Sequence, residues 1–384
     1  GVQTCALPIS TGIAILGDVF VSALKAIAPL LVFFLVISSL CNAGKSHGGV
    51  IKTVIILYMF STVLAAVIAV FASMAFPVKM TLANAATDTS APQGIVEVLN
   101  NLLLNVVANP VSSLVNANYV GILMWAVLLG LAFRAADKMT KKVLADVADG
   151  ISMVVTWIIN LAPFGIFGLV FNTVSTNGLD IFTTYGKLLL LLVGCMLFIY
   201  FVTNPLLVYW CIRQNPYPLI FHCLKRSALT AFFTRSSAAN IPVNMKVCEE
   251  MGLDRDTYSV TIPLGATINM DGAAITITVM TMATAFTLGI HVDIPTAIIL
   301  SLLAALSACG ASGVAGGSLL LIPMACSLFG ISDDISMQVV AVGFIIGVVQ
   351  DSVETALNSS SDLLLSASAE FRQWRLEGKE IKFK

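Results

Sequence analysis

The sequence predicts an all-α polytopic membrane protein, and three observations support this prediction. Of the 384 residues, 58% are hydrophobic and 11% are charged, and no water-soluble domain has enough interior to bury so much apolar surface. Apolar segments long enough to cross a bilayer recur along the chain. The last segment, residues 338–365, nevertheless carries three carboxylates, and ionisable groups inside a membrane mark a site for ions or polar solutes.

The apolar segments define the expected helices. In chain order they cover residues 13–40, 50–76, 122–133, 151–174, 188–212, 260–288 and 338–365. Turn-forming residues interrupt the approach to residue 133, from residue 95 onward, so we expect several short helices there. Residues 1–10 lack an initiating Met and the basic and apolar regions of a signal peptide. We expect them to be a truncation scar and leave them out of the fold.

Lysines and arginines are distributed unevenly among the connections. Connections 77–94, 175–185 and 332–336 hold only Lys79 between them, whereas the alternate connections and the C-terminal tail are rich in basic residues. The positive-inside rule places the poor connections outside the cell and the C-terminus in the cytoplasm. The net charge of −1 gives no indication of a nucleic-acid partner.

Two stretches, residues 221–247 and 294–330, do not fit a simple crossing. Small and polar residues interrupt them at T-R-S-S-A-A-N-I-P, residues 234–242, and at G-A-S-G-V-A-G-G-S, residues 310–318. Each half spans about 15 residues, or roughly 22 Å of helix, which is less than the ~30 Å bilayer core. Both therefore predict re-entrant helical hairpins. Because each is followed by a long apolar helix with Asn and Asp, we expect inverted repeats, an architecture of secondary transporters.

Polar groups line one face of the last predicted helix. The steps from Asp351 to Thr355, Asn358 and Asp362 are four, three and four residues, which gives one face over about three turns. Glu354 lies beside them, and the opposite face is apolar, which argues against a surface helix of a soluble protein. A charge at the bilayer centre costs about 3 kcal/mol even on lenient scales, so bound cations must offset these carboxylates.

These residue types favour sodium and an amino-acid substrate. Sodium is a hard cation that takes oxygen ligands, and an ammonium group needs a carboxylate such as Asp351. Irregular backbone at membrane depth is tolerated where a solute or an ion completes its hydrogen bonding. Amides near Ser236, Ser237, Val314 and Gly316 suit a substrate carboxylate. The oxygens that suit sodium belong to the side chains of Asn269, Asp271, Asn358 and Asp362 and to the backbone near Gly265, Thr267, Ala308, Cys309 and Ala311.

The motif I-P-L-G-A-T-I-N-M-D-G-A-A, residues 262–274, is the most specific signal in the chain. With the first tip, the Gly-rich second tip and residues 351–362, it resembles the dicarboxylate/amino acid:cation symporter family, which includes the glutamate transporters, and most of all its bacterial serine/threonine:sodium branch. The resemblance implies a glutamate-transporter-like fold, a homotrimer and elevator-type alternating access, and it implies that the family's first helix is missing here. For the domains, the resemblance implies that residues 11–215 form mainly scaffold and trimerisation helices, although 50–76 and 181–212 lie partly in the transport domain. It also implies that residues 216–370 form the core of the transport domain and that residues 371–384 form a cytoplasmic tail.

The resemblance also implies the site residues. The implied substrate site comprises Arg235, Ser236, Ser237, Val314, Gly316, Asp351, Thr355 and Asn358. One implied sodium site comprises Gly265, Asn269, Asn358 and Asp362, a second uses backbone near Thr267, Ala308, Cys309 and Ala311, and a third comprises Tyr58, Ser61, Thr62, Asn269 and Asp271.

Glu354 is the main departure from relatives that carry acidic substrates, which hold an Arg at this position. A bidentate Arg binds a side-chain carboxylate, whereas Glu repels one. We therefore expect a small neutral substrate, L-serine or L-threonine, imported with Na⁺ across the bacterial inner membrane. A second departure is Ala315, where many relatives have Pro.

Other functions fit the sequence less well. A proton-coupled carrier of small amino acids or dicarboxylates, in which Glu354 titrates, is the nearest alternative, since a buried carboxylate can bind a proton. A passive channel is a remote one. An intramembrane aspartyl protease would use Asp271 and Asp351, but the G-x-G-D-type context is absent. The glycines of residues 310–317 follow no strand and precede no G-K-[ST], so a nucleotide-binding loop is excluded. We expect a transporter, not an enzyme.

Overall fold

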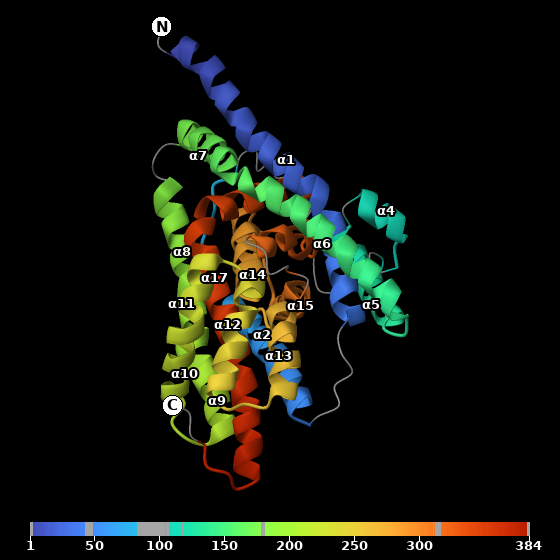
Figure 1. Ribbon diagram of the computed structural model, residues 1–384. Coiled ribbons are helices and arrows are strands. Elements are labelled where there is room, and N and C mark those ends of the chain that lie inside the picture. Colours follow the sequence, from blue (N-terminus) through green and yellow to red (C-terminus); the bar gives the residue numbers. More distant parts are fainter. Residues whose placement is uncertain are drawn as a thin grey trace.

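The computed structural model describes residues 3–42, 49–82, 104, 107–116, 118–177, 181–309, 311 and 316–381. All regular secondary structure in this part of the chain is helical (Figure 1). It contains five helices that are long and apolar enough to cross a membrane, or six if one bent pair forms a single span. These findings confirm the predicted all-helical, multi-pass architecture.

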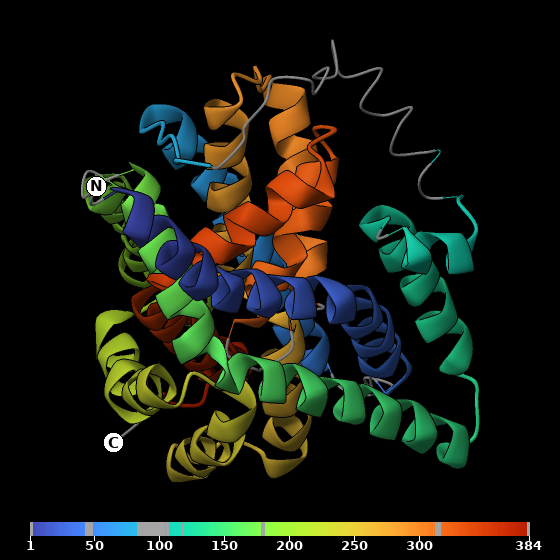
Figure 2. The same cartoon turned by 90° about the horizontal axis from the view of Figure 1, so that it is seen from above.

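One group of helices packs around α1, Gln3–Asn42. Its partners are α5 (Tyr119–Phe133), α6 (Lys138–Asn160) and α7 (Ala162–Asn177), which lie along it in Figures 1 and 2. The helices α1 and α7 approach each other so closely that position 168 requires glycine, because a Cβ on Gly168 would lie 2.5 Å from the backbone nitrogen of Gly17. The helix α1 includes residues 3–10, which the sequence analysis left out of the fold.

The second group surrounds α17, Asp333–Leu376, the longest helix described. It includes α2 (Gly49–Ala75), α8 (Ile181–Phe198), α9 (Asn204–Ile212), α13 (Arg255–Ile268) and α14 (Asp271–Thr287). The two groups meet where the ring of Phe20 on α1 packs edge-on against Phe344 of α17, 5.2 Å between ring centroids. Every residue of α14 from Asp271 to Ala285 is buried, so this helix lies in the core.

Two predicted continuous segments are interrupted in the structure, and a third stays continuous but contains a π-helical turn. Segment 151–174 divides into α6 and α7, which are bent by 50° at a break just before Pro163, because proline removes a helical N–H and crowds the preceding turn. Segment 260–288 breaks at Asn269 and Met270, whose backbone leaves the helical region. A π-helical turn, Ile199–Thr203, separates α8 from α9.

The short helices expected before residue 133 are confirmed over the residues described. The helix α4, Pro110–Val115, begins at Asn109, whose Oδ1 accepts a hydrogen bond from Val111 N at 2.9 Å. Asn118 begins α5 in the same way, since its Oδ1 accepts from Gly121 N at 3.2 Å. Asparagine side chains satisfy amides that have no partner inside a helix.

The two stretches with small-residue tips are broken where the sequence predicts. In the first, α10 (Tyr217–Cys223), a π-helical turn (Leu224–Ala228) and α11 (Leu229–Thr234) lead to Arg235, which adopts φ 49°, and α12 (Ser237–Glu250) follows. In the second, α15 (Ile294–Ala308) precedes a 3₁₀ turn (Gly317–Leu321) and α16 (Ile322–Ser327). Within each stretch the segments on either side of the tip pack against each other.

Candidate functional site

The polar face predicted for the last helix exists and is buried. Asp351, Thr355, Asn358 and Asp362 are each at most 6% exposed, and Glu354 beside them is 5% exposed. They face α2, α13, α14 and the second tip, which together supply the hydrogen bonds described below. A single helical face thus gathers polar groups from segments far apart in the sequence.

Asp362 lies in a cluster with Asn269 and Tyr58. Asn269 Nδ2 donates to Asp362 Oδ1 at 2.9 Å, and the Tyr58 hydroxyl donates to the Asp362 carbonyl at 2.8 Å. Gly265 makes this possible, because a Cβ there would lie 2.7 Å from Asp362 Oδ1. Asn269 Oδ1 is buried and has no hydrogen-bond partner among the described residues. It is therefore an oxygen available to a hard cation.

Asp271 forms a second cluster with α2. Ser61 Oγ donates to Asp271 Oδ2 at 2.7 Å, and Thr62 Oγ1 donates to Oδ1 at 3.2 Å. All three side chains are fully buried. Asp271 is also the first residue of α14, where the helix dipole favours a negative charge. The residues predicted for the third sodium site divide between the two clusters: Ser61 and Thr62 bond Asp271, whereas Tyr58 and Asn269 bond Asp362.

Asn358 and Asp351 connect α17 to the neighbouring segments. The Gly272 N–H donates to Asn358 Oδ1 at 2.7 Å, and the Gly316 N–H donates to Asp351 Oδ1 at 3.2 Å. Gly316 has φ 74°, a left-handed conformation that favours glycine. The second tip therefore contacts the carboxylate predicted to bind an ammonium group.

Glu354 accepts three hydrogen bonds at one oxygen. Its Oε2 accepts from Thr276 Oγ1 at 2.6 Å, from Ser318 Oγ at 2.9 Å and from Gln350 Nε2 at 2.5 Å. Sequence reasoning selected Glu354 but gave no role to these three donors. Only Gln350 had a usable signal, its spacing of four residues from Glu354 on a helix.

The predicted backbone site near the second tip is partly described. Cys309 Sγ lies 3.6 Å from the carbonyl oxygen of Ile268, which brings the end of α15 against the end of α13. Thr267, Ala308, Cys309 and Ala311 therefore belong to neighbouring helix ends. Val314 lies outside the described residues.

The first tip supplies its predicted groups from a sharp turn. Arg235 is left-handed, Ser236 Oγ accepts from Ala239 N at 3.2 Å to begin α12, and Ser237 is buried. Sequence reasoning missed the contacts that hold α12 on α17: Asn240 Nδ2 donates to Ser359 Oγ and Asn244 Nδ2 donates to the Ser359 carbonyl, both at 2.8 Å. The spacing of four residues between Asn240 and Asn244 was a usable signal in the sequence, because it places both side chains on one face of a helix.

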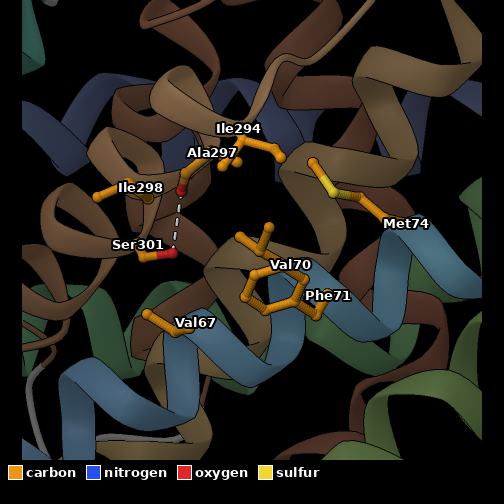
Figure 3. Close-up of a pocket in the computed structure, with 8 residues that line it drawn as sticks. All are labelled: Val67, Val70, Phe71, Met74, Ile294, Ala297, Ile298 and Ser301. Carbon is orange, nitrogen blue, oxygen red and sulfur yellow. Dashed lines mark hydrogen bonds between the residues drawn. The ribbon is translucent and has the colours of Figure 1, made fainter.

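A pocket between α2 and α15 lies apart from this polar cluster (Figure 3). The hydroxyl of Ser301, its one polar side chain, already donates to the Ala297 carbonyl at 3.0 Å. The pocket is otherwise apolar and does not suit an ion or a zwitterion. Its lining comprises Val67, Val70, Phe71, Met74, Ile294, Ala297, Ile298 and Ser301.

Comparison with known proteins agrees with the resemblance seen in the motifs. The model of the sodium:dicarboxylate symporter family matches residues 4–370. The serine/threonine transporter SstT of Bifidobacterium adolescentis is 59% identical over 376 residues, which is 98% of this chain and 87% of that transporter. The expectation of a transporter and not an enzyme is confirmed. This chain belongs to the sodium:dicarboxylate symporter family.

Proposed function

We propose that this protein imports L-serine and L-threonine by sodium symport. The observation that carries the proposal is the group of carboxylates buried around α14 and α17, next to Asn269 Oδ1, which has no partner in the described part of the chain. The name of the relative that is 59% identical supports the choice of substrate.

The charges of the site support cation coupling. Asp271, Asp351, Glu354 and Asp362 are each at most 5% exposed, and none of them forms a salt bridge with another described residue. Breaking or omitting the partner of a buried charge is strongly destabilising. Sodium ions and the substrate ammonium group would supply the missing positive charge, which couples the binding of one to the binding of the other.

Each predicted residue has a role in this scheme. Asp351 binds the substrate ammonium group, while Arg235, the tip backbone near Ser236, Ser237, Val314 and Gly316, Thr355 and Asn358 bind its carboxylate and hold it in place. Sodium binds at Asn269, Asp271 and Asp362, with the backbone of Gly265, Thr267, Ala308, Cys309 and Ala311 and the hydroxyls of Tyr58, Ser61 and Thr62. Glu354 excludes acidic substrates, because a carboxylate side chain would meet a like charge.

The proposed movement is of the elevator type, with re-entrant hairpins at 221–247 and 294–330 forming inverted repeats. The separate packing of α1, α5, α6 and α7 supports a scaffold in residues 11–215, to which α2 and α8 contribute only in part because they pack on the transport core, residues 216–370. We further propose a homotrimer in the bacterial inner membrane with residues 371–384 in the cytoplasm, in line with the distribution of basic residues.

Reconstitution tests the function directly. Proteoliposomes containing the purified chain should accumulate radiolabelled serine only when an inward sodium gradient is present. Asp351→Ala and Asp362→Ala should abolish accumulation in folded protein. Uptake that is indifferent to sodium would refute coupling, and flux without concentration would indicate a channel.

A proton-coupled carrier is a second candidate because Glu354 is buried and has no salt-bridge partner among the described residues. Such a carboxylate is a candidate to bind a proton during transport. If Glu354 couples protons, Glu354→Gln should remove the pH dependence of uptake. An unchanged pH profile would eliminate this candidate and leave the sodium symporter.

A further inference from the structure

Gln350 has a buried oxygen that the site does not use. The side chain is 1% exposed, and its Oε1 has no hydrogen-bond partner among the described residues. A buried acceptor without a donor loses its hydration and gains nothing in return. We propose that Gln350 Oε1 accepts a hydrogen bond from the side-chain hydroxyl of the substrate, so that Gln350 selects small amino acids with a β-hydroxyl group.

The neighbouring hydrogen bonds fix which end of the amide is left over. Gln350 Nε2 donates to Glu354 Oε2 at 2.5 Å and to Thr276 Oγ1 at 2.8 Å. The Thr276 hydroxyl uses its own proton on Glu354 Oε2 at 2.6 Å. Reversing the amide would place its oxygen against the carboxylate, where two acceptors repel. The network therefore fixes Oε1 as the amide atom that has no partner within the described ranges.

The position of Gln350 fits a role in reading the substrate side chain, and this step depends on the proposed function. Asp351, the predicted ammonium site, is the next residue, and it is bonded to the second tip through Gly316 N. Gln350 and Glu354 are four residues apart, so they lie one above the other on the same face of α17. An amino acid anchored at Asp351 presents its short side chain to these two residues.

Glu354 has a different role from Gln350. The three hydrogen bonds that Glu354 accepts from described residues all end on Oε2, and its negative charge repels acidic substrates. Gln350 Oε1 distinguishes serine from alanine, because a hydroxyl donates a hydrogen bond to it and a methyl group does not. Ser318 and Thr276 are positioning residues for Glu354, and Thr276 Oγ1 also accepts a hydrogen bond from Gln350 Nε2.

Competition in proteoliposomes tests the inference. Sodium-driven uptake of labelled serine is inhibited with unlabelled serine, alanine or L-2-aminobutyrate, which replaces the serine hydroxyl with a methyl group. In the unchanged protein we expect aminobutyrate to bind about three- to tenfold more weakly than serine, which is what one neutral hydrogen bond is worth. Gln350→Met keeps the side-chain size and should bring this ratio close to one.

Ser318→Ala is the matched control, because Ser318 donates to the same carboxylate at 2.9 Å and makes no described hydrogen bond to Gln350. It should weaken all three inhibitors alike and preserve their ratio. An unchanged ratio in Gln350→Met would overturn the inference. If that variant does not fold, the unchanged protein decides, since equal binding of serine and aminobutyrate would also overturn it. Absence of sodium-driven serine uptake in the unchanged protein would instead refute the proposed function.

Discussion

Replacing Gly272 with alanine tests the close contact between α14 and α17. Gly272 lies in the first turn of α14, and a Cβ there would be 2.9 Å from both Cα and the carbonyl oxygen of Glu354. These are backbone atoms, so they have no side-chain rotation that would relieve the clash. The Gly272 N–H also donates to Asn358 Oδ1 at 2.7 Å, and separating the helices would stretch this hydrogen bond.

The expected loss follows from these contacts. Overpacking a core costs about 1–3 kcal/mol, and a weakened hydrogen bond adds up to about 1 kcal/mol. The helix preference of alanine over glycine returns about 0.5–1 kcal/mol. We therefore expect Gly272→Ala to lower the free energy of unfolding by about 1–3 kcal/mol and to weaken sodium activation of serine uptake, because the shift moves Asn358.

Gly194→Ala in α8 is the matched control, because a Cβ there would meet no atom within 4 Å. It should leave unfolding in detergent unchanged or slightly raise the midpoint, and uptake should stay normal. If Gly272→Ala unfolds at the same temperature as Gly194→Ala and keeps the same sodium dependence, the tight packing of α14 on α17 is not the constraint inferred here.

Three further changes test other parts of the structure. Asp271→Asn removes the charge that Ser61 and Thr62 stabilise, so the sodium concentration for half-maximal serine uptake should rise at least tenfold; an unaltered value would remove Asp271 from the sodium site. Tyr58→Phe deletes the hydroxyl bonded to the Asp362 carbonyl at 2.8 Å and should lower the free energy of unfolding by about 1–2 kcal/mol, and denaturation in detergent without such a loss would contradict the contact. Hydrogen bonds from Thr296, first from its side chain and second from its N–H at 3.0 Å, lower the pKa of Asp293 below its ordinary 3.8. The stabilisation of the folded protein by the Asp293 carboxylate is present above pH 3.8 and is lost as the pH falls through the lower pKa of the folded state. Asp293→Asn should still cap α15 but should not show this acid-dependent loss. Identical acid unfolding curves for the variant and the unchanged protein would refute the assignment.

Much of the architecture follows from local patterns in the sequence. Apolar length alone predicts the membrane-spanning helices, and helical spacing places Asp351, Thr355, Asn358 and Asp362 on one face, because both properties depend only on neighbouring residues. Asparagines at positions 109 and 118 likewise mark the starts of α4 and α5 before any tertiary contact is known. The small-residue tips predict where the two interrupted stretches break.

Other features were decided by contacts between distant segments. The break at Asn269 was not predicted, because the side chain leaves the helix to bond Asp362, 93 residues away. Likewise, Thr276 and Ser318 look like ordinary polar residues until α14 and the second tip bring them to Glu354.

Periodicity therefore determined which groups this chain places inside the membrane, and packing decided which of them meet. A buried charge or amide needs partners within hydrogen-bonding distance, and a local repeat specifies the direction of a side chain but not the segment that it faces. The resemblance implies one site for Ser61 and Asp271, but only the tertiary structure gave the hydrogen bond between them, 210 residues apart, and left the oxygens of Asn269 and Gln350 without described partners.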